Sequence, residues 1–291
     1  RVSCTREHFE VLMALRPKVW MWESVTQAPT KGRELVDELT AKCLENGYSV
    51  TEVFHDAKDL GTPQTRKRWF MVAHRVEVDF STEHLVPETS AVDALAKIKP
   101  VGPPAYDSGS NKDFDEHLHL IPAGARLRNW QENNLAPEGG WEIKSNGHAK
   151  GRVGFGHVRL KAEGPATATV GYSMVHPVEH RFLTVNEVQA LAGFPQSYKF
   201  IGGSNGAKQL DYIARGVCPP VGEWFARRVA AAIEANVAIA EPSIKIVDLI
   251  TKKERVKMPK VSQPTERTTP AKTAAVGSRN AMKGDRKSTR L

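Results

Sequence analysis

The feature that most constrains the fold is the order of hydrophobic patterns in the first 80 residues. Val19–Trp22 is a short apolar run, typical of a buried strand. Arg33–Asn46 has apolar residues at helical spacing and is followed by Gly47, which favours a helix end. Ser49–Phe54 and Trp69–Ala73 are rich in β-branched or aromatic residues and indicate strands. This order predicts part of an α/β sheet.

The composition changes beyond residue 80. Residues 81–180 are rich in Gly, Pro, Asn and His, with weak periodicity, and predict an irregular, loop-rich lobe. Residues 181–240 return to helical patterns, with a capping-box sequence at Thr184–Glu187 and a later helix that begins at Pro219. We expect residues 1–80 and 181–240 to form one α/β body, which the lobe faces across a cleft.

The positive charge is concentrated at the end of the chain. Residues 252–291 hold 12 Lys and Arg against three Asp and Glu, a net of +9, so a chain total of +8 leaves −1 for the rest. This stretch is almost free of aromatic residues, which indicates disorder. We therefore predict a basic, disordered tail over residues 241–291.

The cysteines exclude two kinds of site. Cys4, Cys43 and Cys218 are widely separated, and no Cys-x-x-Cys pair or His-Cys cluster is present. The sequence therefore favours neither a disulfide framework nor a metal site, and it favours a reduced, cytoplasmic setting. Because no run of 18 or more apolar residues occurs, we expect no membrane span.

Two segments carry side chains suited to chemistry. Glu23 follows an apolar strand, at the end where α/β folds build their sites, although it also fits an ordinary strand-to-loop junction. Gln64, Arg66 and Arg68 alternate, so on one strand they would share a face rich in hydrogen-bond donors. A solvated strand edge would explain the same pattern.

Four segments in order resemble the DNA cytosine-5 methyltransferase family. They are Glu23-Ser-Val25, Pro63-Gln-Thr-Arg-Lys-Arg68, the stretch from Arg181 to Pro195, and Ala214-Arg-Gly-Val-Cys-Pro-Pro220. The resemblance spans residues 9–235 and is to the C-terminal portion of the family's domain. It implies the C-terminal part of a Rossmann-like methyltransferase fold, with residues 81–180 as a target-recognition lobe and 181–240 as closing helices.

The resemblance also implies a reaction. The family transfers a methyl group from S-adenosylmethionine to carbon 5 of a cytosine flipped out of double-stranded DNA. By the match, Glu23 holds ring nitrogen 3 and the exocyclic amine, and Arg68 holds the carbonyl oxygen, with Arg66 and Gln64 in support. Arg215, Gly216 and Val217 match the family's segment near the cofactor.

Some parts of the family pattern are missing from this sequence. It contains neither a Phe-x-Gly-x-Gly cofactor loop nor the Pro-Cys pair that carries the nucleophile. Cys4 follows Ser3 and lies too near Glu23 for the family's spacing, so we do not expect it to be that nucleophile. Ser24 replaces the usual Asn, and Ala214-Arg215 replaces the usual Gly-Asn.

Three hypotheses fit these gaps. The chain is expected to be an incomplete fragment of a bacterial or phage-encoded methyltransferase, inactive alone, as its first residue, Arg1, suggests. One alternative is a natural DNA-recognition subunit that pairs with a separate N-terminal methyltransferase subunit. The other is a non-catalytic DNA-binding remnant.

Overall fold

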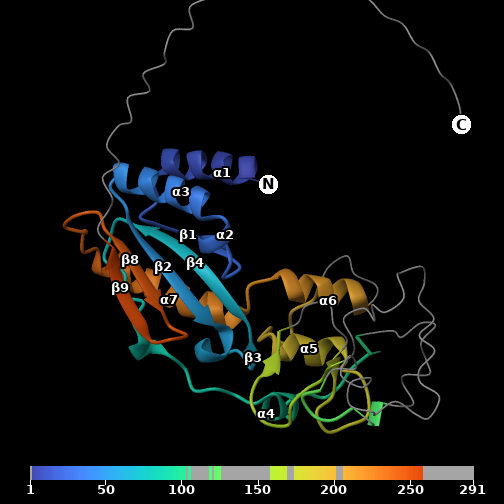
Figure 1. The fold of residues 1–291 in the computed structure, drawn as a ribbon. Coiled ribbons are helices and arrows are strands. Elements are labelled where there is room, and N and C mark those ends of the chain that lie inside the picture. The colour runs from blue at the N-terminus through green and yellow to red at the C-terminus, as the bar shows by residue number, and fades with distance from the viewer. Residues whose placement is uncertain are drawn as a thin grey trace, which may run out of the picture. The chain divides into compact units, whose positions relative to one another are not determined.

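A computed structural model describes two thirds of the chain (Figure 1). The described residues are 2–102, 104–105, 118–119, 121–125, 158–168, 174–200 and 206–257. Much of the expected lobe over residues 81–180, and the end of the chain from residue 258, lie outside these ranges.

Helices and strands alternate through the first part of the described chain. In order, they are α1 (Val2–Leu15), β1 (Val19–Ser24), α2 (Ala28–Lys31), α3 (Arg33–Glu45), β2 (Ser49–Asp56), the 3-10 turn η1 (Ala57–Leu60), β3 (Gln64–Thr65), β4 (Lys67–His74), η2 (Thr82–His84) and α4 (Ala91–Leu95). There follow β5 (Val158–Arg159), β6 (Ala166–Thr167), β7 (Met174–Val175), α5 (Val185–Leu191), α6 (Gly206–Arg215), α7 (Pro219–Ala235), β8 (Ile244–Asp248) and β9 (Lys253–Lys257). The strands and the helix expected within the first 80 residues are confirmed.

The main sheet has five strands in the order β1-β4-β2-β8-β9. β4 is antiparallel to both β1 and β2, while β2 and β8 run parallel. In this register Glu23 lies opposite Phe70, and His55 lies opposite Arg68. Because side chains alternate along a strand, all four share one face of the sheet.

Helices cover both faces of this sheet (Figure 1). On one face, Trp69 and Met71 of β4 pack in a cluster with side chains of α1 and α3. On the other, Phe70 and Val72 pack in a cluster with Trp224 and its neighbours on α7. A strand buried on both faces reads as one continuous apolar run, which is the pattern of Trp69–Ala73 in the sequence.

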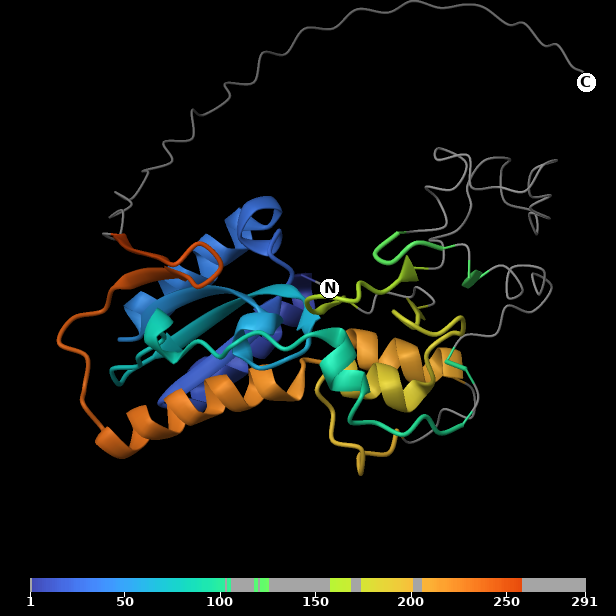
Figure 2. The same cartoon turned by 90° about the horizontal axis from the view of Figure 1, so that it is seen from below.

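A third cluster lies around α4, α5 and α6 (Figure 2). Leu183, Val188 and Leu191 pack there with Leu210 and Ile213 of α6. The capping box at the start of α5 is confirmed, with reciprocal contacts between Thr184 and Glu187. These helices therefore pack mainly on one another and on short strands of residues 158–175, while α7 packs on the main sheet.

The expectation of disorder from residue 241 is wrong for residues 244–257. β8 and β9 form a hairpin, and β8 pairs with β2 from Val50–Ile244 to Phe54–Asp248. The physical reason is that Val247 is fully buried in the cluster that contains Val53 of β2, while Ile246 is nearly buried on the opposite face of the sheet. The predicted tail beyond residue 257 lies outside the described residues.

Candidate functional site

Glu23 and Arg68 meet at one end of the main sheet. Glu23 is near the end of β1, and Arg68 is near the start of the antiparallel neighbour β4, so the pairing brings them together. Arg68 Nε lies 3.1 Å from Glu23 Oε1, and both side chains are only partly exposed. A second guanidinium nitrogen, Nη1, donates to the carbonyl of Lys67 at 2.8 Å. The structure thus brings together the two residues that the sequence singled out as the principal chemical groups.

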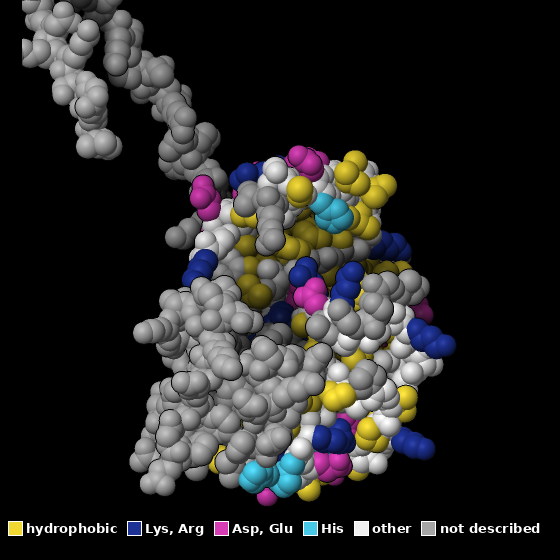
Figure 3. Space-filling model, turned by 90° about the vertical axis from the view of Figure 1, so that its right-hand side faces the viewer, with side chains coloured by type: hydrophobic (Ala, Val, Ile, Leu, Met, Phe, Trp, Pro, Cys, Tyr) yellow, Lys and Arg dark blue, Asp and Glu magenta, His cyan; other side chains and the backbone are white. Residues whose placement is uncertain are grey.

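A small pocket surrounds this ion pair between the sheet and the start of α7. Its lining consists of Glu23, His55, Ala57, Arg66, Arg68, Phe70, Val217, Cys218 and Val221. Its free space is about 10 Å³, which is at the lower limit for holding a single water. Figure 3 shows acidic and basic side chains next to each other in the hollowed middle of the described surface, below a hollow with hydrophobic side chains.

The hydrophobic hollow is a separate groove. It is lined by residues of α1, β1 and α3, among them Phe9, Leu12, Trp20 and Trp22, with Cys4 at its rim. Cys4 is exposed on α1 and does not line the pocket around Glu23 and Arg68.

Arg66 is held by the backbone and is nearly inaccessible. Its Nη2 donates to the carbonyl of Ala214 at 2.8 Å and to that of Gly216 at 3.1 Å, and its backbone N–H donates to Asp56 at 2.7 Å. Burial, followed by the positive charge of Arg68, lowers the pKa of Arg66 from its ordinary value. Arg66 therefore ties the end of α6 and the segment that follows it to the sheet, and it also lines the pocket.

Gln64 does not share a strand with Arg68. It lies on the two-residue strand β3, which pairs with Ala166 and Thr167 of β6, and its side chain is buried. The expectation that Gln64, Arg66 and Arg68 share one face of a single strand is therefore wrong. The chain passes from β3 to β4 between Gln64 and Lys67. Gln64 does not line the pocket around Glu23 and Arg68.

The residues matched to the cofactor segment give a mixed result. Arg215 is 78% exposed and pairs with Asp211 at 2.8 Å, so its side chain is directed to solvent. The carbonyl of Gly216 is used by Arg66, and Val217 lines the pocket. These three residues alone offer neither a carboxylate for a ribose nor a flat apolar surface for an adenine ring, so they do not form a cofactor site by themselves.

Two pocket residues were missed by sequence reasoning. His55 is buried, and burial, followed by the charges of Arg68 and Arg66, lowers its pKa to about 3. Cys218 is buried at the start of α7, and burial raises the pKa of its thiol. His55 could have been identified as a pocket residue only from the strand register, which places it opposite Arg68. Within the described ranges, no group of three or more potential ligands is arranged to hold a metal ion.

Known proteins resemble this chain over most of its length. A family model described as C-5 cytosine-specific DNA methylase matches residues 5–231. The type II methyltransferase M.BspRI of Lysinibacillus sphaericus is 24% identical over 78% of this chain and 53% of its own length. M.NlaX of Neisseria lactamica is 26% identical over 77% of this chain and 66% of its own length. The chain thus spans about half to two thirds of the curated relatives it matches.

A solved structure supports the fold. It is described as a DNA modification methyltransferase encoded within a prophage of E. coli, and it aligns with a TM-score of 0.56 at 16% identity. The alignment covers 78% of this chain and 72% of that one. The mixed α/β sheet accordingly has the Rossmann-like methyltransferase fold. No helix among the described residues is both long and apolar enough to cross a membrane.

Proposed function

Because the chain belongs to the C-5 cytosine-specific DNA methylase family, we propose that it supplies the base-holding side of a DNA (cytosine-5-)-methyltransferase. The observation that carries this proposal is the contact between Glu23 and Arg68 at 3.1 Å, at the mouth of a pocket at one end of the sheet. Once they separate from each other, a neighbouring carboxylate and guanidinium can offer hydrogen-bond acceptors and donors to the polar edge of a single base.

The two groups suit the charges that develop on cytosine during methylation. Carbon 5 is a weak nucleophile until a thiolate adds to carbon 6 and makes the ring enamine-like. Negative charge then builds on ring nitrogen 3 and on the carbonyl oxygen. Glu23 would hold a proton at nitrogen 3, and Arg68 would donate hydrogen bonds to the oxygen.

The thiolate is not assigned to any of the three cysteines. Cys4 lies in the separate groove. Cys43 is buried, and burial raises the pKa of its thiol to about 12. Cys218 lines the pocket, but burial raises its pKa too, which disfavours the reactive thiolate. A Pro-Cys segment, absent from these 291 residues, would have to supply the nucleophile.

The remaining partners follow from the family. The proposed substrate is double-stranded DNA, and the proposed methyl donor is S-adenosylmethionine, which supplies the methyl group. We assign target recognition to residues 81–180 and a supporting role to residues 181–240. The Gly216–Val217 segment would border the donor only together with further residues, because alone it forms no cofactor site. As part of a bacterial or phage-encoded restriction-modification enzyme, the protein would act in the cytoplasm.

The first test uses the chain alone. It should transfer no tritium from labelled S-adenosylmethionine to a cytosine-containing duplex, because it holds no Pro-Cys pair. Activity that disappears in Cys4→Ser would overturn both this expectation and our interpretation of Cys4.

The second test supplies the Pro-Cys segment, either in one reading frame or as a separate polypeptide. Glu23→Gln and Arg68→Ala should each lower turnover more than DNA affinity, because phosphate contacts dominate affinity while these side chains hold the base. Arg227→Ala is a matched control, since that arginine pairs with Glu223 at the surface and lies outside the pocket. Loss of DNA binding with an unchanged single-turnover rate would show that the assigned roles are wrong.

A further inference from the structure

His55 is a buried polar side chain whose hydrogen-bonding capacity is unused. It lines the same pocket as Glu23 and Arg68, and its side chain is about 1% exposed. Neither ring nitrogen has a hydrogen-bond partner, although the backbone of Asp56 lies near enough to favour the protonated ring. Buried polar groups are nearly always paired, so an unpaired one in a pocket indicates a missing partner.

The ring is neutral and firmly held. Burial, with Arg68 and Arg66 nearby, lowers the pKa of His55 to about 3, so one ring nitrogen keeps its lone pair at neutral pH. The rings of Phe70 and Phe225 pack on it with centroid distances of 5.5 Å and 5.8 Å. The imidazole is therefore a fixed acceptor and cannot easily turn away.

Arg68 is the donor best placed to reach this acceptor. The strand register sets Arg68 directly opposite His55 on the same sheet face, and both line the pocket. A guanidinium has five N–H donors, of which the hydrogen bond to Lys67 and the ion pair to Glu23 engage two nitrogens. Arg66, the other nearby cation, donates to the carbonyls of Ala214 and Gly216 instead.

The contact between Glu23 and Arg68 keeps the pocket closed to any base. Their facing atoms are 3.1 Å apart, and the free space inside is about 10 Å³, which fits a water but no pyrimidine ring. A base that is held by both residues must first separate them. Arg68 then exchanges Glu23 for the carbonyl oxygen of the base, and the guanidinium N–H groups that do not face the base can donate to an acceptor in the pocket wall.

We propose that His55 is a positioning residue that accepts a hydrogen bond from the Arg68 guanidinium when Arg68 separates from Glu23. Arg68 would thus have two positions, one on Glu23 in the closed pocket and one on His55 in the open pocket. The second position orients the remaining guanidinium donors toward the guest. This inference rests on the proposed function only for the guest's identity as a base.

The experiment removes the competing acceptor without using DNA. Nuclear magnetic resonance of the ¹⁵N-labelled 291-residue chain at neutral pH reports whether each histidine ring nitrogen is free or hydrogen-bonded. In Glu23→Ala the acceptor nitrogen of His55 should shift toward the hydrogen-bonded range. In the double variant Glu23→Ala with Arg68→Met the shift should disappear. Glu23→Gln, which keeps a weaker acceptor for Arg68, should give a smaller shift in the same direction.

His74 is the internal control. It is also buried, but its ring already interacts with Thr51 at 3.0 Å and with the carbonyl of Val76 at 2.8 Å, so its signals should stay constant in every variant. A His55 signal that is unchanged in Glu23→Ala, or a shift that persists without Arg68, would refute the proposal. Neither result bears on methyl transfer, so failure of this inference is distinguishable from failure of the proposed function.

Discussion

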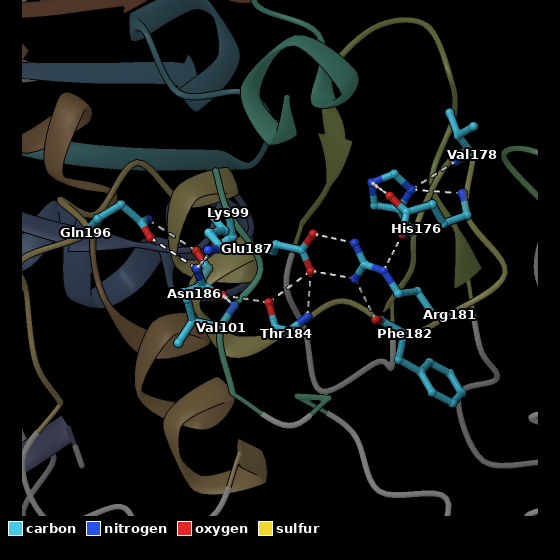
Figure 4. A network of polar contacts seen from close by, with 11 residues as sticks. Lys99, Val101, His176, Val178, Arg181, Phe182, Thr184, Asn186, Glu187 and Gln196 are labelled. Atoms are coloured by element: carbon cyan, nitrogen blue, oxygen red, sulfur yellow. Dashed lines mark hydrogen bonds and ion pairs between the residues drawn. The ribbon is translucent and has the colours of Figure 1, made fainter. Parts of the chain in front are cut away.

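Replacing Glu187 with alanine should destabilise the protein substantially, because this carboxylate joins a loop to the start of α5. Figure 4 shows Glu187 between Arg181 and Thr184. Its two oxygens accept from Arg181 Nη1 and Nη2, each at 2.8 Å, and one oxygen also accepts from the backbone N–H of Thr184 at 2.8 Å. The Glu187 side chain is only 2% exposed, so no water replaces these contacts easily.

The magnitude follows from the contacts that alanine removes. Loss of the capping acceptor costs about 1 kcal/mol. Loss of a hydrogen bond to a charged group costs roughly 1.5–3 kcal/mol. Arg181 is not left as an isolated charge, because it is 30% exposed and keeps Glu179 at 2.6 Å. The free energy of unfolding should therefore fall by about 2–4 kcal/mol, which is a large share of the ~5–15 kcal/mol of a typical domain.

Urea denaturation, followed by tryptophan fluorescence and circular dichroism, measures this loss. Glu179→Ala is the matched control, because Glu179 binds the same guanidinium from a position that is 56% exposed. Such exposed pairs contribute about 0–1 kcal/mol. The reasoning fails if the two variants lose equal stability, or if Glu187→Ala loses less than about 1 kcal/mol.

Three further outcomes are expected. Burial alone would raise the pKa of Glu187, but the hydrogen bonds of Arg181 and Thr184 outweigh it and hold the pKa below its ordinary value. This lowered pKa stabilises the folded protein. The stabilisation is complete above the pKa of the carboxyl group in the unfolded chain, about 4.3, and is lost as the pH falls through its pKa in the folded protein. Between about pH 5 and 3, the free energy of unfolding measured by urea titration should therefore fall more in the wild type than in Glu187→Gln. Residues 258–291 carry eight Lys and Arg against two Asp and Glu. Their deletion should weaken binding to non-specific DNA at low salt and make DNA affinity less dependent on salt concentration. A change in the DNA sequence that is preferred would contradict this prediction. A thiol reagent should label only the exposed Cys4 in the native chain and all three cysteines in denaturant. Rapid labelling of a second thiol in the native chain would show that burial does not protect Cys43 and Cys218.

The parts of the fold that follow from local pattern were predictable from the sequence. The central strand β4 was recognisable because its residues are buried on both faces, and α3 because its apolar residues recur at helical spacing. The capping box of Thr184 and Glu187 was recognisable because its contacts join residues three apart. Each of these signals is contained in a few consecutive residues.

The parts that depend on pairing between distant strands were not predictable. The family resemblance assigned Glu23 and Arg68 to the same base, but their direct contact depends on the antiparallel register of β1 and β4. The register of β2 with β4 gives His55 its position opposite Arg68, and no short sequence pattern reveals it. The hairpin β8–β9 was hidden because its strands lie beside and within a basic stretch, where composition alone favours disorder.

The parallel pairing of β2 with β8 also determines when the sheet can be completed during synthesis. Ser49 and Ser243, which meet at the start of this pair, are 194 residues apart in the sequence. A contact of that span forms slowly, since a long loop must close first. During synthesis, the edge of β2 that pairs with β8 stays unpaired until Ile244–Asp248 has been made. Until then the backbone N–H and C=O groups along that edge are open to pairing with another chain, and slower translation between β2 and β8 would prolong this exposure.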